Sequence, residues 1–177
     1  MRFHVDPDIT KAATLPASFY RDPSIFEELK EKVFLKSWQW LGQADHLFKA
    51  ANVYLQCLLE HYLDEPIILV NQADGFRCMS NVCTHRGNIL MHHPSTVNKI
   101  TCNYHGRRFD ASGQMEFMPE FKHAVDFPRP CDHLRQFPTH NWFGQLFAAL
   151  DPAFHFQPIL TKMEERIGFL PLQNLTY

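Results

Sequence analysis

Two short pairs of cysteine and histidine constrain this chain more than any other feature. Cys83 and His85 are separated by one residue and Cys102 and His105 by two, with sixteen residues between the pairs. Two cysteines and two histidines match the ligand set of a [2Fe–2S] cluster in which the cysteines hold one iron and the histidines hold the other. Such a cluster transfers single electrons, so the sequence predicts an electron-transfer site.

The mixed composition of each pair favours two irons over one zinc ion. A zinc site usually takes its ligands as a cysteine pair and a histidine pair, with each pair closing on the same ion. Here each loop would give one ligand to each iron. Gly87 and Gly106 follow the two pairs, and glycine lets the backbone come close to a bound group. A zinc-stabilised binding module stays open as an alternative on ligand type.

Several segments of the chain match one known pattern: residues 83–87 (CTHRG), 102–106 (CNYHG), 109–110 (FD) and Gly113, preceded by residues 15–20 (LPASFY) and 34–42 (FLKSWQWLG). Together they resemble the N-terminal part of the large (α) subunit of ring-hydroxylating non-haem iron oxygenases, which carries a Rieske [2Fe–2S] domain. One departure is Arg107, because the family often has tryptophan after the second His-Gly.

The resemblance implies a mainly β fold, a Rieske-type (ISP-like) antiparallel β-sheet domain with N- and C-terminal helical flanks. It implies that a [2Fe–2S] cluster is bound by Cys83, His85, Cys102 and His105. It also implies a reductase or ferredoxin as electron donor and a full-length homo-oligomer, commonly a trimer. The residues beside the ligands, which we expect to lie close to the cluster, are Arg86, Gly87, Tyr104 and Gly106.

Hydrophobic periodicity divides the chain into three parts. We expect an N-terminal arm and helix in residues 1–37, with the helix at about 23–36, the cluster domain in residues 38–155, and a C-terminal helix and linker in residues 156–177, with the helix at about 159–167. The cluster domain is predicted to consist of short strands. One of them is a long apolar strand from Trp142 to Leu150. In the resembling family such flanks pack on a catalytic domain.

The oxygen-activating half of such an enzyme is not predicted in this chain. The family's mononuclear Fe(II) is held by two histidines and one carboxylate. His92 and His93 are adjacent, and the remaining histidines form no chelating pair. We therefore predict no catalytic residues here, expect the Fe(II) in a domain absent from this chain, and expect a fragment of a longer oxidoreductase. Its substrate, and whether it is a mono- or dioxygenase, depend on that domain.

Composition excludes other classes of function. The net charge of −2 gives no reason to expect nucleic acid or an anionic membrane as partner. There is no apolar run of the length that a membrane span needs, and the N-terminus lacks the apolar core of a signal peptide. Five cysteines, of which the motif claims two, favour a reducing, cytoplasmic setting. The other three are expected to be free: Cys57, Cys78 and Cys131.

Two single residues near the motif and one pair of arginines have two interpretations each. Arg86 either orients a carboxylate or is a surface cation. Tyr104 either donates a hydrogen bond near a sulfide or packs its ring over the cluster. Arg107, with Arg108, either forms a docking patch for an acidic partner or belongs to a solvated turn. The second C-x-H pattern, at Cys131, has no following glycine and is expected to be structural.

Two other functions remain open beside the oxygenase domain. The first is a stand-alone Rieske ferredoxin, an electron carrier and no enzyme. The helical flanks disfavour it, because a carrier needs little beyond the cluster domain. The second is the zinc-stabilised module. Iron with a Rieske-type EPR signal would exclude zinc.

Overall fold

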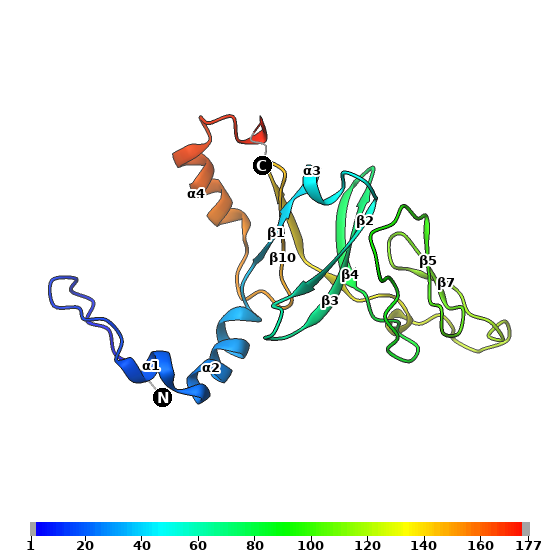
Figure 1. Cartoon of the computed structure of the whole chain (residues 1–177), viewed down its shortest axis with the longest axis horizontal. Helices are drawn as coiled ribbons and strands as arrows, with labels where there is room; N and C mark the ends of the chain where they lie inside the picture. The colour runs from blue at the N-terminus through cyan, green and yellow to red at the C-terminus, as the bar shows by residue number, and fades with distance from the viewer. Residues whose placement is uncertain (1–2, 175–177) are drawn as a thin grey trace.

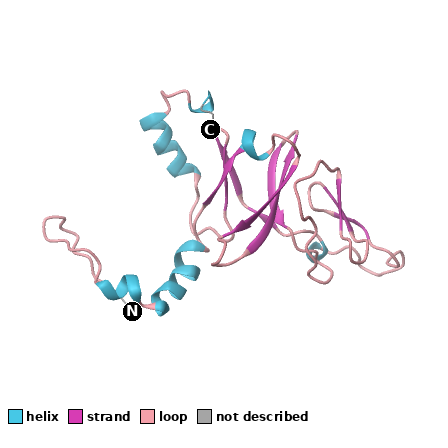
Figure 2. Ribbon diagram, in the orientation of Figure 1, coloured by secondary structure: helices cyan, strands magenta, loops and turns pink. Residues whose placement is uncertain are grey.

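The computed structural model describes residues 3–174 and contains three antiparallel sheets in that part of the chain. Helices occupy both ends of the chain, and the strands lie between them (Figure 1 and Figure 2). The prediction of a mainly β fold with helical flanks is therefore confirmed. No helix within residues 3–174 is long and apolar enough to cross a membrane.

The central sheet has the order β2-β3-β4-β8, formed by Val53–Leu58, Glu65–Gln72, Gly75–Ser80 and Gln136–Phe137. Its middle strand β3 carries an unbroken apolar run, residues 67–70, that is fully buried. Successive side chains of a strand point to opposite faces. Ile68 and Val70 accordingly join one hydrophobic core, and Ile67 and Leu69 join a second core on the other face. The central sheet is therefore packed on both sides.

The first core separates the central sheet from the sheet β5-β6-β7, formed by Lys99–Thr101, Arg108–Asp110 and Met115–Phe117. Cys83 and Cys102 belong to this core, together with Met79 and Phe109. The small sheet lies at the end of the molecule opposite to the N-terminal arm (Figure 1). Both predicted cysteine ligands are thus embedded where the two sheets meet.

The second core lies against the sheet β1-β10-β9, formed by Gln39–Gln43, Gln145–Ala148 and Thr139–Trp142. The prediction of one long strand from Trp142 to Leu150 is wrong, because the chain reverses at Phe143 and Gly144. Both residues have positive φ, 49° and 83°, as a tight hairpin turn requires. Asn141 Oδ1 accepts the N–H of Gly144 at 2.9 Å and closes the turn.

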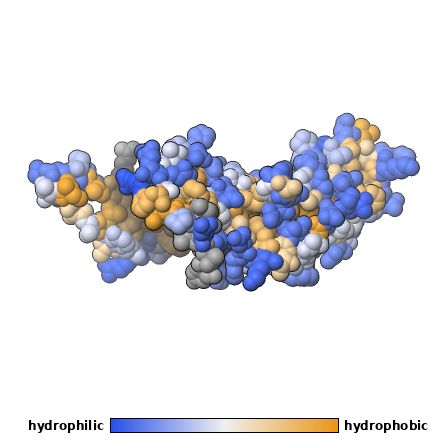
Figure 3. Space-filling model, turned by 90° about the horizontal axis from the view of Figure 1, so that it is seen from above, coloured by the Kyte–Doolittle hydropathy of each residue, from blue (hydrophilic) through white to orange (hydrophobic). Residues whose placement is uncertain are grey.

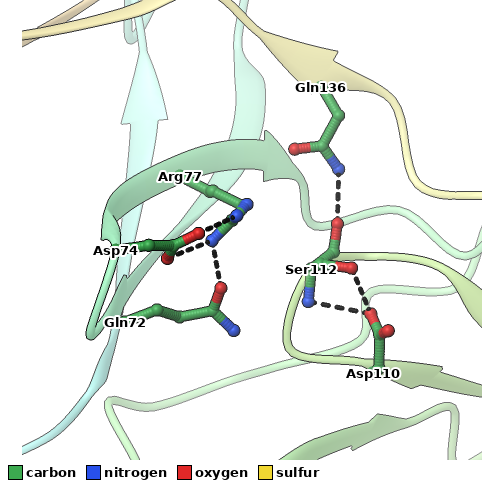
Figure 4. A network of polar contacts seen from close by, with 6 residues as sticks. All are labelled: Gln72, Asp74, Arg77, Asp110, Ser112 and Gln136. Atoms are coloured by element: carbon green, nitrogen blue, oxygen red, sulfur yellow. Dashed lines mark hydrogen bonds and ion pairs between the residues drawn. The ribbon is translucent and has the colours of Figure 1, made fainter.

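A polar turn attaches the small sheet to the central one (Figure 4). Ser112 donates from its N–H and its hydroxyl to Asp110 Oδ1 at 2.8 and 2.7 Å. Gln136 of β8 donates from Nε2 to the carbonyl of Ser112 at 3.0 Å. Burial alone would raise the pKa of Asp110, but hydrogen bonds from Ser112 and Gln114, with the charge of Arg77, together lower it. The carboxylate therefore stays ionised and holds the turn.

The N-terminal flank contains helices α1, Ala17–Arg21, and α2, Pro23–Leu29. Asp22 caps α2 by accepting the N–H of Ser24 at 2.9 Å, and Pro23 stands at the start of the helix, where proline is favoured. The helix continues as a π-helical segment, Lys30–Phe34. It therefore ends slightly earlier than residue 36, the end predicted from the sequence. Helix α1 was not expected from the sequence, and neither was the short helix α3, Ala44–Leu47.

The C-terminal flank contains helix α4, Gln157–Ile167, close to the predicted bounds, and a 3₁₀ turn at Leu172–Asn174. Leu160 is the buried residue of α4. Glu164 accepts a hydrogen bond from Trp142 Nε1 at 2.9 Å, which ties the helix to β9. The three-part division at residues 37 and 155 stays a prediction.

The three cysteines outside the motif differ in accessibility, which predicts a labelling order. All three are free. Cys131 is exposed, whereas Cys78 is 1% exposed and its pKa is raised strongly by burial. Because the thiolate is the reactive form, native protein should be alkylated by iodoacetamide at Cys131 and not at Cys78. Peptide mass mapping checks this, with urea-unfolded protein as the control. Equal labelling of both thiols in the native protein would contradict the buried position of Cys78.

Candidate metal centre

The two Cys-His pairs lie on two loops that share one backbone hydrogen-bond pattern. In the first loop, which follows β4, Cys83 N–H donates to Asn88 O at 2.8 Å, and Gly87 N–H donates to Cys83 O at 3.0 Å. In the second loop, which follows β5, Cys102 N–H donates to Arg107 O and Gly106 N–H donates to Cys102 O at the same two distances. Each loop thus bonds residue i to residue i+5 and closes at a glycine.

The glycines of the two loops adopt a conformation that other residues rarely take. Gly87 has φ +70° and Gly106 has φ +72°. This left-handed conformation is strained for residues with a Cβ. The glycines therefore allow each loop to turn back and point its cysteine and histidine in the same direction.

The two cysteine side chains form one half of the candidate site. Cys83 and Cys102 are each 2% exposed, and each thiol shifts the pKa of the other. Burial raises the pKa of Cys83. Burial acts in the same direction on Cys102, but hydrogen bonds from the backbone of Tyr104 and His105 and from the side chain of Asn88 lower its pKa overall. The site thus carries N–H donors aimed at sulfur, an arrangement that stabilises a thiolate.

The two histidine side chains form the other half. The ring centroids of His85 and His105 are 4.8 Å apart, with the rings nearly perpendicular. Burial first, and then His105, Arg107 and Arg86, lower the pKa of His85, so its imidazole is neutral, the form that binds metals. Nδ1 of His105 is buried and has no hydrogen-bond partner. Buried polar atoms are rarely left unpaired, and a metal ion would satisfy this one.

The donor set fits a two-iron cluster. The four side chains form a sulfur pair and a nitrogen pair, each pair drawing one member from each loop. Within residues 3–174, no group of three or more His, Cys, Asp or Glu side chains is placed to hold a single metal ion. The structure therefore arranges the four predicted ligands as two pairs, each with one member from each loop; their assignment as ligands stays a prediction.

The residues beside the ligands take different positions. The ring of Tyr104 lies against that of His105, with centroids 3.8 Å apart and the planes tilted by 36°, and Tyr104 is 57% exposed. Arg86 is exposed. The expectation that Arg107 lies on the surface, as part of a docking patch or a solvated turn, is wrong. Arg107 is 3% exposed, because Asp132 supplies a buried countercharge at 3.3 Å.

The other histidines and cysteines lie outside the site. His92 and His93 are exposed. Cys131 is also exposed. His133 uses its Nδ1 to accept the N–H of Met115 at 2.9 Å, and a structural role for Cys131 itself stays a prediction. Sequence reasoning missed Asp132 as a neighbour of the site, and the only local signal was its place inside that pattern.

Comparison with known proteins identifies a family that this chain matches. A family model described as "Rieske [2Fe-2S] domain" matches residues 37–138. The carnitine monooxygenase oxygenase subunit of Escherichia coli (strain K12) is 33% identical over 144 residues, which are 80% of this chain and 37% of that protein. The biphenyl dioxygenase subunit alpha of Metapseudomonas furukawaii is 30% identical over 112 residues, which are 62% of this chain and 24% of that protein.

Solved structures agree with the fold. The apo form of a quaternary ammonium Rieske monooxygenase superposes with a TM-score of 0.74 at 23% identity, covering 93% of this chain and 48% of that one. A naphthalene 1,2-dioxygenase with bound indole superposes with a TM-score of 0.64 at 25% identity, covering 76% and 30%. The chain spans less than two fifths of the length of the curated relatives named above.

Proposed function

Because the chain belongs to the Rieske [2Fe-2S] domain family, we propose that it is an electron-transfer domain of a Rieske non-haem iron oxygenase. In this proposal Cys83, His85, Cys102 and His105 bind a [2Fe–2S] cluster. The observation that carries the proposal is the pairing of side chains across the loops, thiol with thiol and imidazole with imidazole. When bound, the cluster supplies reversible one-electron transfer.

The protein contributes an asymmetric environment to this chemistry. The thiols of Cys83 and Cys102 lie in the core, so water is excluded from the sulfur side. Backbone hydrogen bonds from His85, Tyr104 and His105 act to lower the pKa of the cysteine thiols, and such donors stabilise negative charge on sulfur. His85 and His105 are only half-buried. The imidazoles therefore form the edge of the site that a partner protein can approach.

We further propose that this domain works with a partner domain and a partner protein. The relatives that it matches are oxygenase subunits, and the chain covers only part of each. A mononuclear Fe(II) is placed in the remaining part of such a subunit, and a reductase or ferredoxin is the proposed electron donor. A homotrimer and a cytoplasmic location belong to the same proposal.

The flanks at residues 1–37 and 156–177 are the proposed contacts with that remaining part. They carry exposed apolar side chains, among them Ile9 at 87%, Tyr20 at 67% and Phe169 at 82% exposure. Apolar patches are visible on the arm side of the molecule (Figure 3), and exposed apolar surface of this kind marks interaction sites. These flanks favour an oxygenase domain over a stand-alone ferredoxin, which would have no use for them.

Metal analysis of the whole chain tests the cluster. Protein prepared or reconstituted anaerobically should contain about two irons and two acid-labile sulfides per chain. After reduction it should show the EPR signal of a Rieske centre, since two nitrogen ligands on one iron make the cluster electronically asymmetric. Zinc without sulfide, or a four-cysteine type of EPR spectrum, would contradict the proposed ligand set. Protein that takes up neither iron nor zinc would contradict any metal role for the site.

A further inference from the structure

A polar cluster built on a buried ion pair links the two ligand loops. Its centre is Arg107, which follows Gly106 and is 3% exposed. Nη1 of Arg107 donates to the hydroxyl of Thr84 at 2.8 Å and lies 3.3 Å from Oδ1 of Asp132. We call Thr84, Arg107 and Asp132 the latch.

The three latch residues all contact one another. The hydroxyl of Thr84 accepts from Arg107 and donates to the backbone carbonyl of Asp132 at 2.7 Å. The second carboxylate oxygen of Asp132 accepts the N–H of Arg129 at 2.8 Å. The ring of Phe127 lies 5.6 Å from the guanidinium carbon of Arg107. Each member therefore contacts the other two, and the carboxylate is also fixed by its own backbone turn.

The three members come from three separate segments. Thr84 stands between Cys83 and His85 in the first ligand loop. Arg107 closes the second ligand loop, because its carbonyl accepts the N–H of Cys102 at 2.8 Å. Asp132 belongs to the 3₁₀ turn Pro130–Asp132, which leads into β8. No direct hydrogen bond of the latch ends on a ligand side chain, yet both loops are tied to one buried ion pair.

We propose that the latch positions the two ligand loops relative to each other, so that Thr84, Arg107 and Asp132 are positioning residues for the cluster. The inference rests on the proposed function. A buried ion pair contributes little net stability compared with apolar packing, because desolvation offsets the attraction. Its hydrogen bonds, however, are directional and strong in a low-dielectric interior. The latch is therefore suited to fix a distance between loops, and outer contacts of this kind commonly control how firmly a metal centre is held.

The test compares the whole chain with variants after anaerobic reconstitution. Asp132→Asn keeps the shape of the side chain and removes the countercharge of Arg107. Thr84→Val keeps both charges and removes only the bridging hydroxyl. Asp151→Asn is the control, because Asp151 forms an ion pair with Lys36 that is exposed and lies outside the latch. The rate of iron release to a ferrous chelator and the EPR spectrum of the reduced protein are measured for each.

Asp132→Asn is expected to release iron about 10- to 100-fold faster than the wild type and to broaden the EPR signal, as the loops sample several spacings. Thr84→Val should shift both readouts in the same direction, and Asp132→Glu should restore them in part. The Asp151→Asn control should match the wild type. If Asp132→Asn fails to fold, the Thr84→Val variant alone tests the positioning role of the latch.

Two results would overturn the inference in distinguishable ways. If Asp132→Asn and Thr84→Val hold iron at the wild-type rate with an unchanged EPR spectrum, the latch is structural only, even where the melting temperature falls. If the wild-type chain itself takes up no iron and sulfide, the proposed function fails, and the inference fails with it.

Discussion

Substitution of His85 by alanine is expected to leave the chain unable to retain a [2Fe–2S] cluster. The imidazole of His85 pairs with that of His105, and alanine would leave one iron with a single protein nitrogen. Burial lowers the pKa of His85, so its ligand form is available at neutral pH in the wild type. Iron and acid-labile sulfide, measured after anaerobic reconstitution, should fall from about two of each per chain to near zero.

His92→Ala is the matched control for this prediction. His92 lies only a few residues beyond the first ligand loop and is exposed, so its loss should change neither iron content nor fold. Circular dichroism of both variants without metal would show that the His85 effect does not come from unfolding. Normal iron and sulfide in His85→Ala would remove this residue from the ligand set.

Gly113→Ala is expected to have the largest effect on stability, lowering the free energy of unfolding by about 2–5 kcal/mol. Gly113 has φ +82°, a conformation that costs roughly 1–2 kcal/mol for other residues. An added Cβ would also lie 2.7 Å from Gln136 Nε2, 2.9 Å from Met79 Sδ and 3.2 Å from Leu134 Cβ. Overpacking of this kind costs about 1–3 kcal/mol. Urea unfolding of the chain without metal measures the sum.

The variant Gly144→Ala separates the steric contribution to this loss of stability from the backbone contribution. Gly144 has φ +83° but no neighbour within 4 Å of an added Cβ, so only the backbone cost of roughly 1–2 kcal/mol applies. Equal losses in the two variants would mean that Gln136 and Met79 move aside without cost. In that case the small sheet would be less tightly attached to the central sheet than the buried position of Met79 suggests.

The candidate ligands were identifiable from the sequence because their signal is local. Residue type and short spacing place a thiol and an imidazole on the same loop, and a following glycine lets each loop turn back. The structure adds what spacing cannot show. The two loops share one hydrogen-bond pattern, and their donors converge on sulfur because β4 and β5 deliver both loops to the same core.

The apolar run from Trp142 to Leu150 shows how a hydrophobic pattern misleads. Its length suggested one buried strand, but β9 and β10 are two strands joined at Gly144. The run starts at Trp142, the last residue of β9, and continues through Phe143 of the turn into β10, so hydrophobicity does not fall at the turn. The turn had a local sign, Asn141 three residues before a glycine, whose side chain closes the hairpin.

The sequence by itself determined the helical flanks and the mainly β class and predicted the candidate ligands, since these depend on residue types at short range and on the alternation of apolar side chains. Only the tertiary structure decided that Arg107 is buried, that Asp132 neutralises it, and that Thr84 joins the two. The physical reason is that a charge can be buried only where an opposite charge is also buried. That partner lies 25 positions away along the chain, where no local pattern reveals it.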